Sequence, residues 1–197
     1  MTLQNTSTND SLTCLSKSEL TELHHFAIEI ADACKDLILR FWASGTFGET
    51  LKTDKTPVSQ VDLQAKALAR KMISNKYPLH GIMGEEYEPI NPKSDYQWTL
   101  DPIDGTQNLI NLIPTFGTLI GLRFKGKAIV GIIDHPVINI RTCGGIGLGV
   151  THNNTQVVLA DLQTSSLTSN DIIATNSPAV FGETTADQEL FTVRLNN

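Results

Sequence analysis

Apolar residues recur with the spacing of a helix in two stretches of the first half of the chain. From Ser16 or Ser18, either of which can cap a helix, to about Ala43, apolar side chains return every three or four residues. The second stretch covers residues 60–77, and Pro78 follows it. The pattern therefore predicts two long amphipathic helices before the middle of the chain.

Beyond residue 80 the pattern changes to short apolar runs that are typical of strands. We expect strands at residues 81–83, 96–100, 115–124, 128–134, 138–143, 156–160, 172–175 and 191–195. Lys125-Gly126 predicts a tight turn between two of them, and the glycine-rich stretch 144–149 indicates a flexible strand edge. Helices followed by hairpin-linked strands favour an α+β domain over a doubly wound fold. The polar residues 1–16 predict a disordered tail, and residues 17–197 the domain.

Composition narrows the function classes. The net charge is −6 and the pI is about 5.3, so no basic surface invites nucleic acid. No apolar run approaches the roughly 20 residues that span a membrane. The three widely spaced cysteines suggest free thiols in a reducing cytosol, hence a cytoplasmic protein.

The residue types that carry chemistry lie after two expected strands. Asp101-Pro102-Ile103-Asp104-Gly105-Thr106 follows one strand, and Gly84-Glu85-Glu86 follows another, with Glu85 sixteen residues before Asp101. Alone, the first motif reads as a plain turn and the second as a charged loop. Together, three carboxylates and the Ile103 carbonyl provide the oxygen ligands that Mg²⁺ takes, and Gly105 lets a phosphate approach the backbone.

A third element precedes the second helix. Residues 50–58 predict a loop or hairpin, and the polar stretch from Lys52 leads to Asp62. The simplest interpretation of Asp62 is a carboxylate in the first turn of a helix, where the dipole favours it.

These three elements together resemble the inositol monophosphatase superfamily, the lithium-sensitive, magnesium-dependent phosphatases, over about residues 20–160. The resemblance implies the N-terminal portion of a layered α-β-α-β-α sandwich of the inositol monophosphatase and sugar phosphatase type. It also implies Mg²⁺ as cofactor. The implied metal ligands are Glu85, Asp101, the Ile103 carbonyl and Asp104.

The same resemblance implies the catalytic groups. Thr106 pairs with Asp62 to activate the attacking water, and Glu85 takes part through the first metal. Gly105 and Thr106 would bind the phosphoryl group through their amides, and Lys52 matches the family's lysine ahead of the Asp62 element.

A finer resemblance concerns the substrate. Residues 114–122 and 131–136 look like the histidinol-phosphatase branch, so the expected partner is a small phosphorylated metabolite. Histidinol phosphate, hydrolysed to histidinol in histidine biosynthesis, comes first and inositol monophosphate second. Homodimer formation is one further partner interaction that the sequence leaves open.

The chain departs from the family pattern near its end. The family's last metal ligand is an Asp directly after Trp or Tyr, and no Trp, Tyr or Phe here precedes Asp. The chain is expected to lack about a quarter to a third of the family's length at its C-terminal end. The alternative to an enzyme is therefore a truncated, non-catalytic remnant that binds metal or a partner without turnover.

Overall fold

The computed structural model describes residues 15–45, 49–51, 57–84 and 87–158. The chain divides into two units, Met1–Val158 and Leu159–Asn197, and all described residues belong to the first. Most of the predicted tail and the strands predicted at 172–175 and 191–195 lie outside the described residues, so the predicted domain bounds stay predictions.

Helix α1 (Lys17–Ser44) forms where the first apolar pattern predicts it. The Ser16 hydroxyl accepts a hydrogen bond from the Glu19 amide at 3.1 Å, which satisfies one of the amides that a helix start leaves open. Gly45 ends the helix in the left-handed conformation, with φ of 65°. One face is buried: Leu20, Leu23, Phe26, Ala27, Ile30, Ala31, Cys34 and Ile38.

A short hairpin leads into the second helix. Strands β1 (Glu49–Leu51) and β2 (Pro57–Ser59) pair antiparallel, and β2 continues directly into α2 (Gln60–Lys76). The Ser59 hydroxyl caps α2 by accepting from the Asp62 amide at 3.2 Å. The hairpin alternative and the second helix are confirmed.

Seven strands form one mixed sheet in the order β3 to β9. Their bounds are β3 Gly81–Met83, β4 Tyr96–Asp104, β5 Gly117–Phe124, β6 Lys127–His135, β7 Ile140–Gly145, β8 Gly149–His152 and β9 Thr155–Val157. Among the strand pairs that the structure describes in this sheet, β3–β4 is parallel and the others form an antiparallel meander. In the predicted turn, Lys125 and Gly126 both have positive φ, as a two-residue hairpin loop requires.

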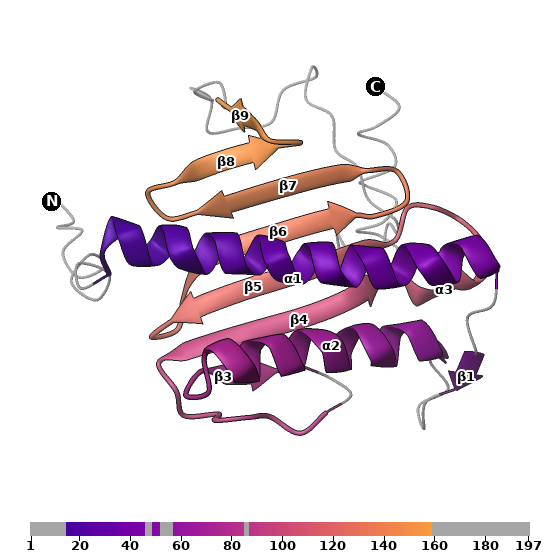
Figure 1. Cartoon of the computed structure of the whole chain (residues 1–197), viewed down its shortest axis with the longest axis horizontal. Coiled ribbons are helices and arrows are strands. Elements are labelled where there is room, and N and C mark those ends of the chain that lie inside the picture. Colours follow the sequence, from indigo (N-terminus) through magenta and orange to yellow (C-terminus); the bar gives the residue numbers. More distant parts are fainter. Residues whose placement is uncertain (1–14, 46–48, 52–56, 85–86, 159–197) are drawn as a thin grey trace, which may run out of the picture. The chain divides into compact units, whose positions relative to one another are not determined.

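Both helices cover the same face of this sheet (Figure 1): α2 contacts β4, and α1 contacts β5, β6 and β7. Alternate strand residues therefore enter one core between helices and sheet. Trp98, Leu122 and Ile132 are among its fully buried side chains. The described part thus has the predicted α+β class.

Two sequence expectations need correction. The strand expected to end at residue 100 continues to Asp104, because a bulge accommodates Pro102 inside it. In the glycine-rich stretch, Gly144 and Gly145 end β7, a turn follows with Gly147 at φ of 70°, and Gly149, at φ of 79°, opens β8, which the apolar pattern did not predict.

His80 lies between two tyrosine rings beside the core. Its ring centroid is 4.5 Å from that of Tyr77 and 4.4 Å from that of Tyr96, with interplanar angles of 6° and 9°. Trp98 donates its indole N–H to Nδ1 of His80 at 3.1 Å, so this nitrogen carries no proton. Burial lowers the pKa of His80, although Glu19 acts in the opposite direction.

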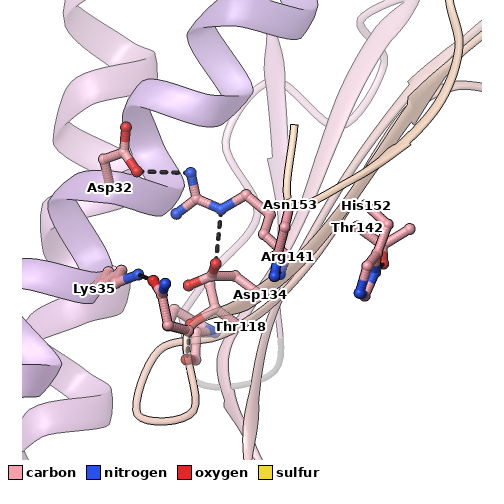
Figure 2. Close-up of polar contacts among 10 residues, drawn as sticks. Asp32, Lys35, Thr118, Asp134, Arg141, Thr142, His152 and Asn153 are labelled. Atoms are coloured by element: carbon pink, nitrogen blue, oxygen red, sulfur yellow. Dashed lines mark hydrogen bonds and ion pairs between the residues drawn. The ribbon is translucent and has the colours of Figure 1, made fainter. Parts of the chain in front are cut away.

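An ion-pair cluster joins α1 to the sheet (Figure 2). Arg141 on β7 donates from Nε to Asp134 at 2.7 Å and from Nη1 to Asp32 on α1 at 2.6 Å. Lys35 donates to the Asn139 side chain at 2.5 Å beside it. Burial disfavours the guanidinium charge, yet the bonds to both carboxylates outweigh this and raise the pKa of Arg141.

Two of the three cysteines lie within the described residues. Cys34 and Cys143 are free and buried, and burial raises the pKa of the Cys34 thiol to about 12. Within the described ranges, no helix has the length and apolar character needed to cross a bilayer.

Candidate active site

The acidic motif lies in a bulge at the end of β4. Asp101 pairs with Leu119 on β5, and Asp104 pairs with Gly117, so three steps along β4 match two along β5. Residues two apart on a strand share a face, and paired residues share it too. The extra residue therefore places Asp101 and Asp104 on the same face of the sheet.

That face is the one opposite the helices. Leu119, Gly121, Gly131 and Ile133 line a shallow apolar depression there, and Asp101 lies at its edge. Asp101 is half-buried and Asp104 is exposed. Two carboxylates on one side of a sheet next to apolar surface favour a bound cation, since the cation offsets their mutual repulsion.

The two residues after the carboxylates form the turn into α3 (Thr106–Ile110). Gly105 has φ of 92°, and a Cβ built on it would lie 3.5 Å from the Phe116 Cβ and 3.6 Å from its Cα. These distances are ordinary van der Waals contacts, so it is the positive φ that favours glycine here. The Thr106 hydroxyl donates to the Ile103 carbonyl at 3.4 Å, which closes the turn.

Asp62 lies in the first turn of α2 and is 3% exposed. Lys66, one turn later and also buried, has its Nζ 3.7 Å from Asp62 Oδ2. Helix α3 contacts β2, and β2 runs into α2, so the elements that carry Thr106 and Asp62 are neighbours.

The oxygen donors fit a hard cation, and the set is incomplete in what the structure describes. Asp101, Asp104 and the Ile103 carbonyl are donors of the type that Mg²⁺ or Ca²⁺ takes. Within the described ranges, no three His, Cys, Asp or Glu side chains gather into a metal site. The predicted ligand Glu85 and the predicted substrate-binding residue Lys52 lie outside these ranges.

Two polar contacts around the bulge involve residues that the sequence analysis did not single out. Thr118 on β5 is fully buried and donates its hydroxyl to the Pro102 carbonyl at 2.7 Å. Nδ1 of His135 donates to the Phe116 carbonyl at 3.0 Å, beside the glycine turn. A hydroxyl at the start of the apolar run 117–122 is the one sequence signal that could have indicated Thr118.

The chain belongs to the inositol monophosphatase family, whose model matches residues 19–195. This confirms the resemblance inferred from the acidic motifs and, with the structural likeness below, the fold class.

Three proteins illustrate the likeness. The chain is 35% identical to the chloroplastic bifunctional phosphatase IMPL2 of Arabidopsis thaliana over 192 residues, covering 93% of this chain and 54% of that protein. It is 31% identical to the histidinol-phosphatase of Chlorobaculum parvum over 140 residues, covering 71% of this chain and 54% of that protein. The crystal structure of the extragenic suppressor protein suhB from Bartonella henselae superposes with a TM-score of 0.66 and 25% identity, covering 71% of this chain and 55% of that one. The chain thus spans about half the length of the curated relatives it matches.

Proposed function

We propose that this chain hydrolyses a small phosphate monoester with Mg²⁺ as cofactor. The observation that carries the proposal is the bulge in β4, which places Asp101 and Asp104 on one face immediately before the Gly105 turn. Membership of a phosphatase family supports the same reaction class.

The metal would be held by Glu85, Asp101, the Ile103 carbonyl and Asp104. Support for Glu85 comes from its neighbour Gly84, since a Cβ built there would lie 3.8 Å from the carbonyl oxygen of Leu100, the residue before Asp101. Bound Mg²⁺ would supply charge that lowers the pKa of water and stabilises a leaving oxygen.

Asp62 and Thr106 would orient the attacking water and take its proton. The burial of Asp62 supports this role, because a carboxylate held away from solvent keeps a fixed orientation. The Gly105 and Thr106 amides would bind phosphoryl oxygens, since the first amides of a helix have no partner within it. Lys52 would add positive charge for the phosphate.

Histidinol phosphate is the first candidate substrate. The similarity to a histidinol-phosphatase and to a bifunctional phosphatase supports it, and inositol monophosphate is the runner-up. We further infer a cytoplasmic protein that acts on a free metabolite and can form a homodimer.

A second candidate is a non-catalytic remnant that binds metal or a partner without turnover. It rests on the departure from the family pattern, since no Trp, Tyr or Phe in this sequence is directly followed by Asp. The reading frame beyond codon 197 discriminates, because an aromatic residue followed by Asp there would restore the enzyme interpretation.

Phosphate release tests the proposal. Histidinol phosphate, inositol 1-phosphate and p-nitrophenyl phosphate are compared with and without Mg²⁺, with Asp101→Asn as blank. Asp95→Asn is the matched control. Asp95 is an exposed carboxylate, and its Oδ2 lies 3.9 Å from Nζ of Lys125. Mg²⁺-dependent release that Asp101→Asn abolishes and Asp95→Asn keeps would establish the phosphatase. Metal binding without release of phosphate from any ester would establish the remnant.

A further inference from the structure

We infer that Thr118 is a positioning residue for the carboxylate turn, and that its hydroxyl fixes the Pro102 carbonyl and thereby the relation of Asp101 to Asp104. The inference deepens the proposed function and rests on it in so far as this turn binds the metal.

The bulge creates the need for such a residue. Asp101 and Asp104 pair with residues two apart on β5, so Pro102 and Ile103 both lie opposite Thr118. The extra residue is left outside the regular ladder, and a buried carbonyl needs a donor. Pro102 and Ile103 are buried, and the Thr118 hydroxyl donates to the Pro102 carbonyl at 2.7 Å.

This bond fixes a backbone torsion next to the expected ligands. The ring of Pro102 already restricts its φ. The direction of the Pro102 carbonyl defines its ψ, and the planar peptide then places the nitrogen of Ile103. At the other side, the Thr106 hydroxyl bonds to the Ile103 carbonyl. Two hydroxyls from separate elements thus hold successive carbonyls of one turn.

The position of Thr118 in the sheet makes this contact rigid. Thr118 pairs with Asp134 on β6, the carboxylate that Arg141 binds, and Figure 2 shows the two residues side by side. Its side chain is fully buried, so no rotation into solvent competes with the bond to Pro102.

The competing explanation is that Thr118 only satisfies a buried carbonyl and contributes to stability. Three variants of the full chain separate the two roles. Thr118→Val removes the hydroxyl and keeps the shape, and Thr118→Ser restores a hydroxyl. Thr142 lies on β7, two strands from β5, and its hydroxyl contacts His152 on β8; Thr142→Val removes that hydroxyl and is the matched control.

Three measurements are made on each variant without substrate: Mn²⁺ affinity from the free-ion electron paramagnetic resonance signal, amide hydrogen exchange across residues 101–106, and thermal midpoint. We expect Thr118→Val to weaken Mn²⁺ binding about 10- to 100-fold, as loss of a group that orients a ligand does. In the same variant, the rate of amide hydrogen exchange in residues 101–106 should rise. Thr118→Ser should recover most of the affinity, and Thr142→Val should leave affinity and exchange unchanged.

Each other outcome is decisive. Wild-type affinity and exchange in Thr118→Val, with only a lower thermal midpoint, would overturn the inference. If the wild-type chain binds no Mn²⁺, the metal part of the proposed function fails, and exchange in 101–106 alone decides on Thr118. If Thr118→Val does not fold, Thr118→Cys, of similar volume and a weak donor, is compared with Thr118→Ser on the same readouts, and equal affinity and exchange would overturn the inference.

Discussion

At the scale of single residues, one extra residue in β4 decides where two charges point. In a regular strand, residues three apart face opposite sides of the sheet. Because of the bulge between Asp101 and Asp104, β4 has one more residue there than β5. Both carboxylates therefore lie on the face opposite the helices. Their repulsion is the physical reason for expecting a cation there, and removal of either charge should weaken cation binding.

Asp101→Asn tests this expectation directly. The amide keeps the side-chain volume and loses the charge, so Mn²⁺ or Mg²⁺ affinity should fall by more than about tenfold. Because Asp101 is half-buried and lies on the sheet face opposite the helices, outside the core, the unfolding free energy should change by less than about 1 kcal/mol. Titration calorimetry and urea unfolding measure the two quantities, and unchanged affinity would show that Asp101 is not a ligand.

His80 predicts a dependence of stability on pH. Its pKa is lowered in the fold, because burial and the Trp98 N–H favour the neutral ring, so below pH 6.5 the unfolded chain binds more protons than the folded one. Stability should therefore fall as the pH drops below 6.5 and be fully present above it. Urea midpoints at pH 7.5 and 5.5 should differ less in His80→Gln than in wild type.

His24, whose pKa is also lowered by burial and then by His25, supplies the control. His24→Gln should also reduce the loss of stability at low pH, independently of His80. A pH dependence in His80→Gln that equals the wild type would mean that the Trp98 contact does not select the neutral ring.

At the scale of elements, the attachment of α1 to β6 and β7 depends on charge as well as apolar contact. Asp134 is 1% exposed, whereas Asp32 is 60% exposed in its side chain. Asp134 Oδ2 and Arg141 Nη2 are buried without a hydrogen-bond partner among the described residues. The Nε bond from Arg141 is thus the main compensation for a buried carboxylate.

Arg141→Met and Asp32→Ala should differ strongly in stability. Removing Arg141 leaves the Asp134 charge buried and unpaired, which costs about 3–5 kcal/mol. Removing Asp32 breaks an ion pair with an exposed partner, worth about 1 kcal/mol or less. Urea unfolding measures both, and the double variant Asp134→Leu/Arg141→Met should recover most of the loss. Equal effects of the two single variants would contradict the compensating role of Arg141.

The sequence predicted those elements whose signals are local. The two helices have caps and a continuous apolar stripe, and the Lys125-Gly126 turn has the residue types its positive φ angles require. The continuation of β4 through Pro102 was missed, because proline normally interrupts a central strand and only pairing with β5 reveals the bulge. Strand β8 was missed because glycines mask its pattern.

The candidate site divides in the same way. Asp101, Asp104 and Gly105 could be predicted as site residues, because they lie in one short motif of distinctive residue types. Thr118 could not, since its contact with Pro102 joins residues sixteen apart through strand pairing. The roles of all the predicted site residues stay predictions, and Glu85 and Lys52 also lie outside the described residues.

At the scale of the whole molecule, the two faces of the sheet differ. Helices α1 and α2 cover one, while the other bears Ile133 and Val150, which are 50% and 37% exposed. Together with Gly121, Gly131 and Gly144 they line the apolar depression beside Asp101. Apolar surface of this kind promotes self-association, which the net charge of −6 opposes through repulsion.

We therefore predict that the 197-residue chain binds an apolar dye and self-associates more in high salt. At 1 M salt the screening length shrinks to about 3 Å, so repulsion no longer keeps copies apart. Ile133→Thr/Val150→Thr should reduce dye fluorescence and salt-induced association, with little loss of stability because threonine suits a strand. Leu79→Thr, an isolated side chain 82% exposed, is the control and should change neither. Dye titration and sedimentation velocity at 0.05 and 1 M salt measure the effects. Dye binding that survives the double substitution would locate the apolar surface elsewhere in the chain.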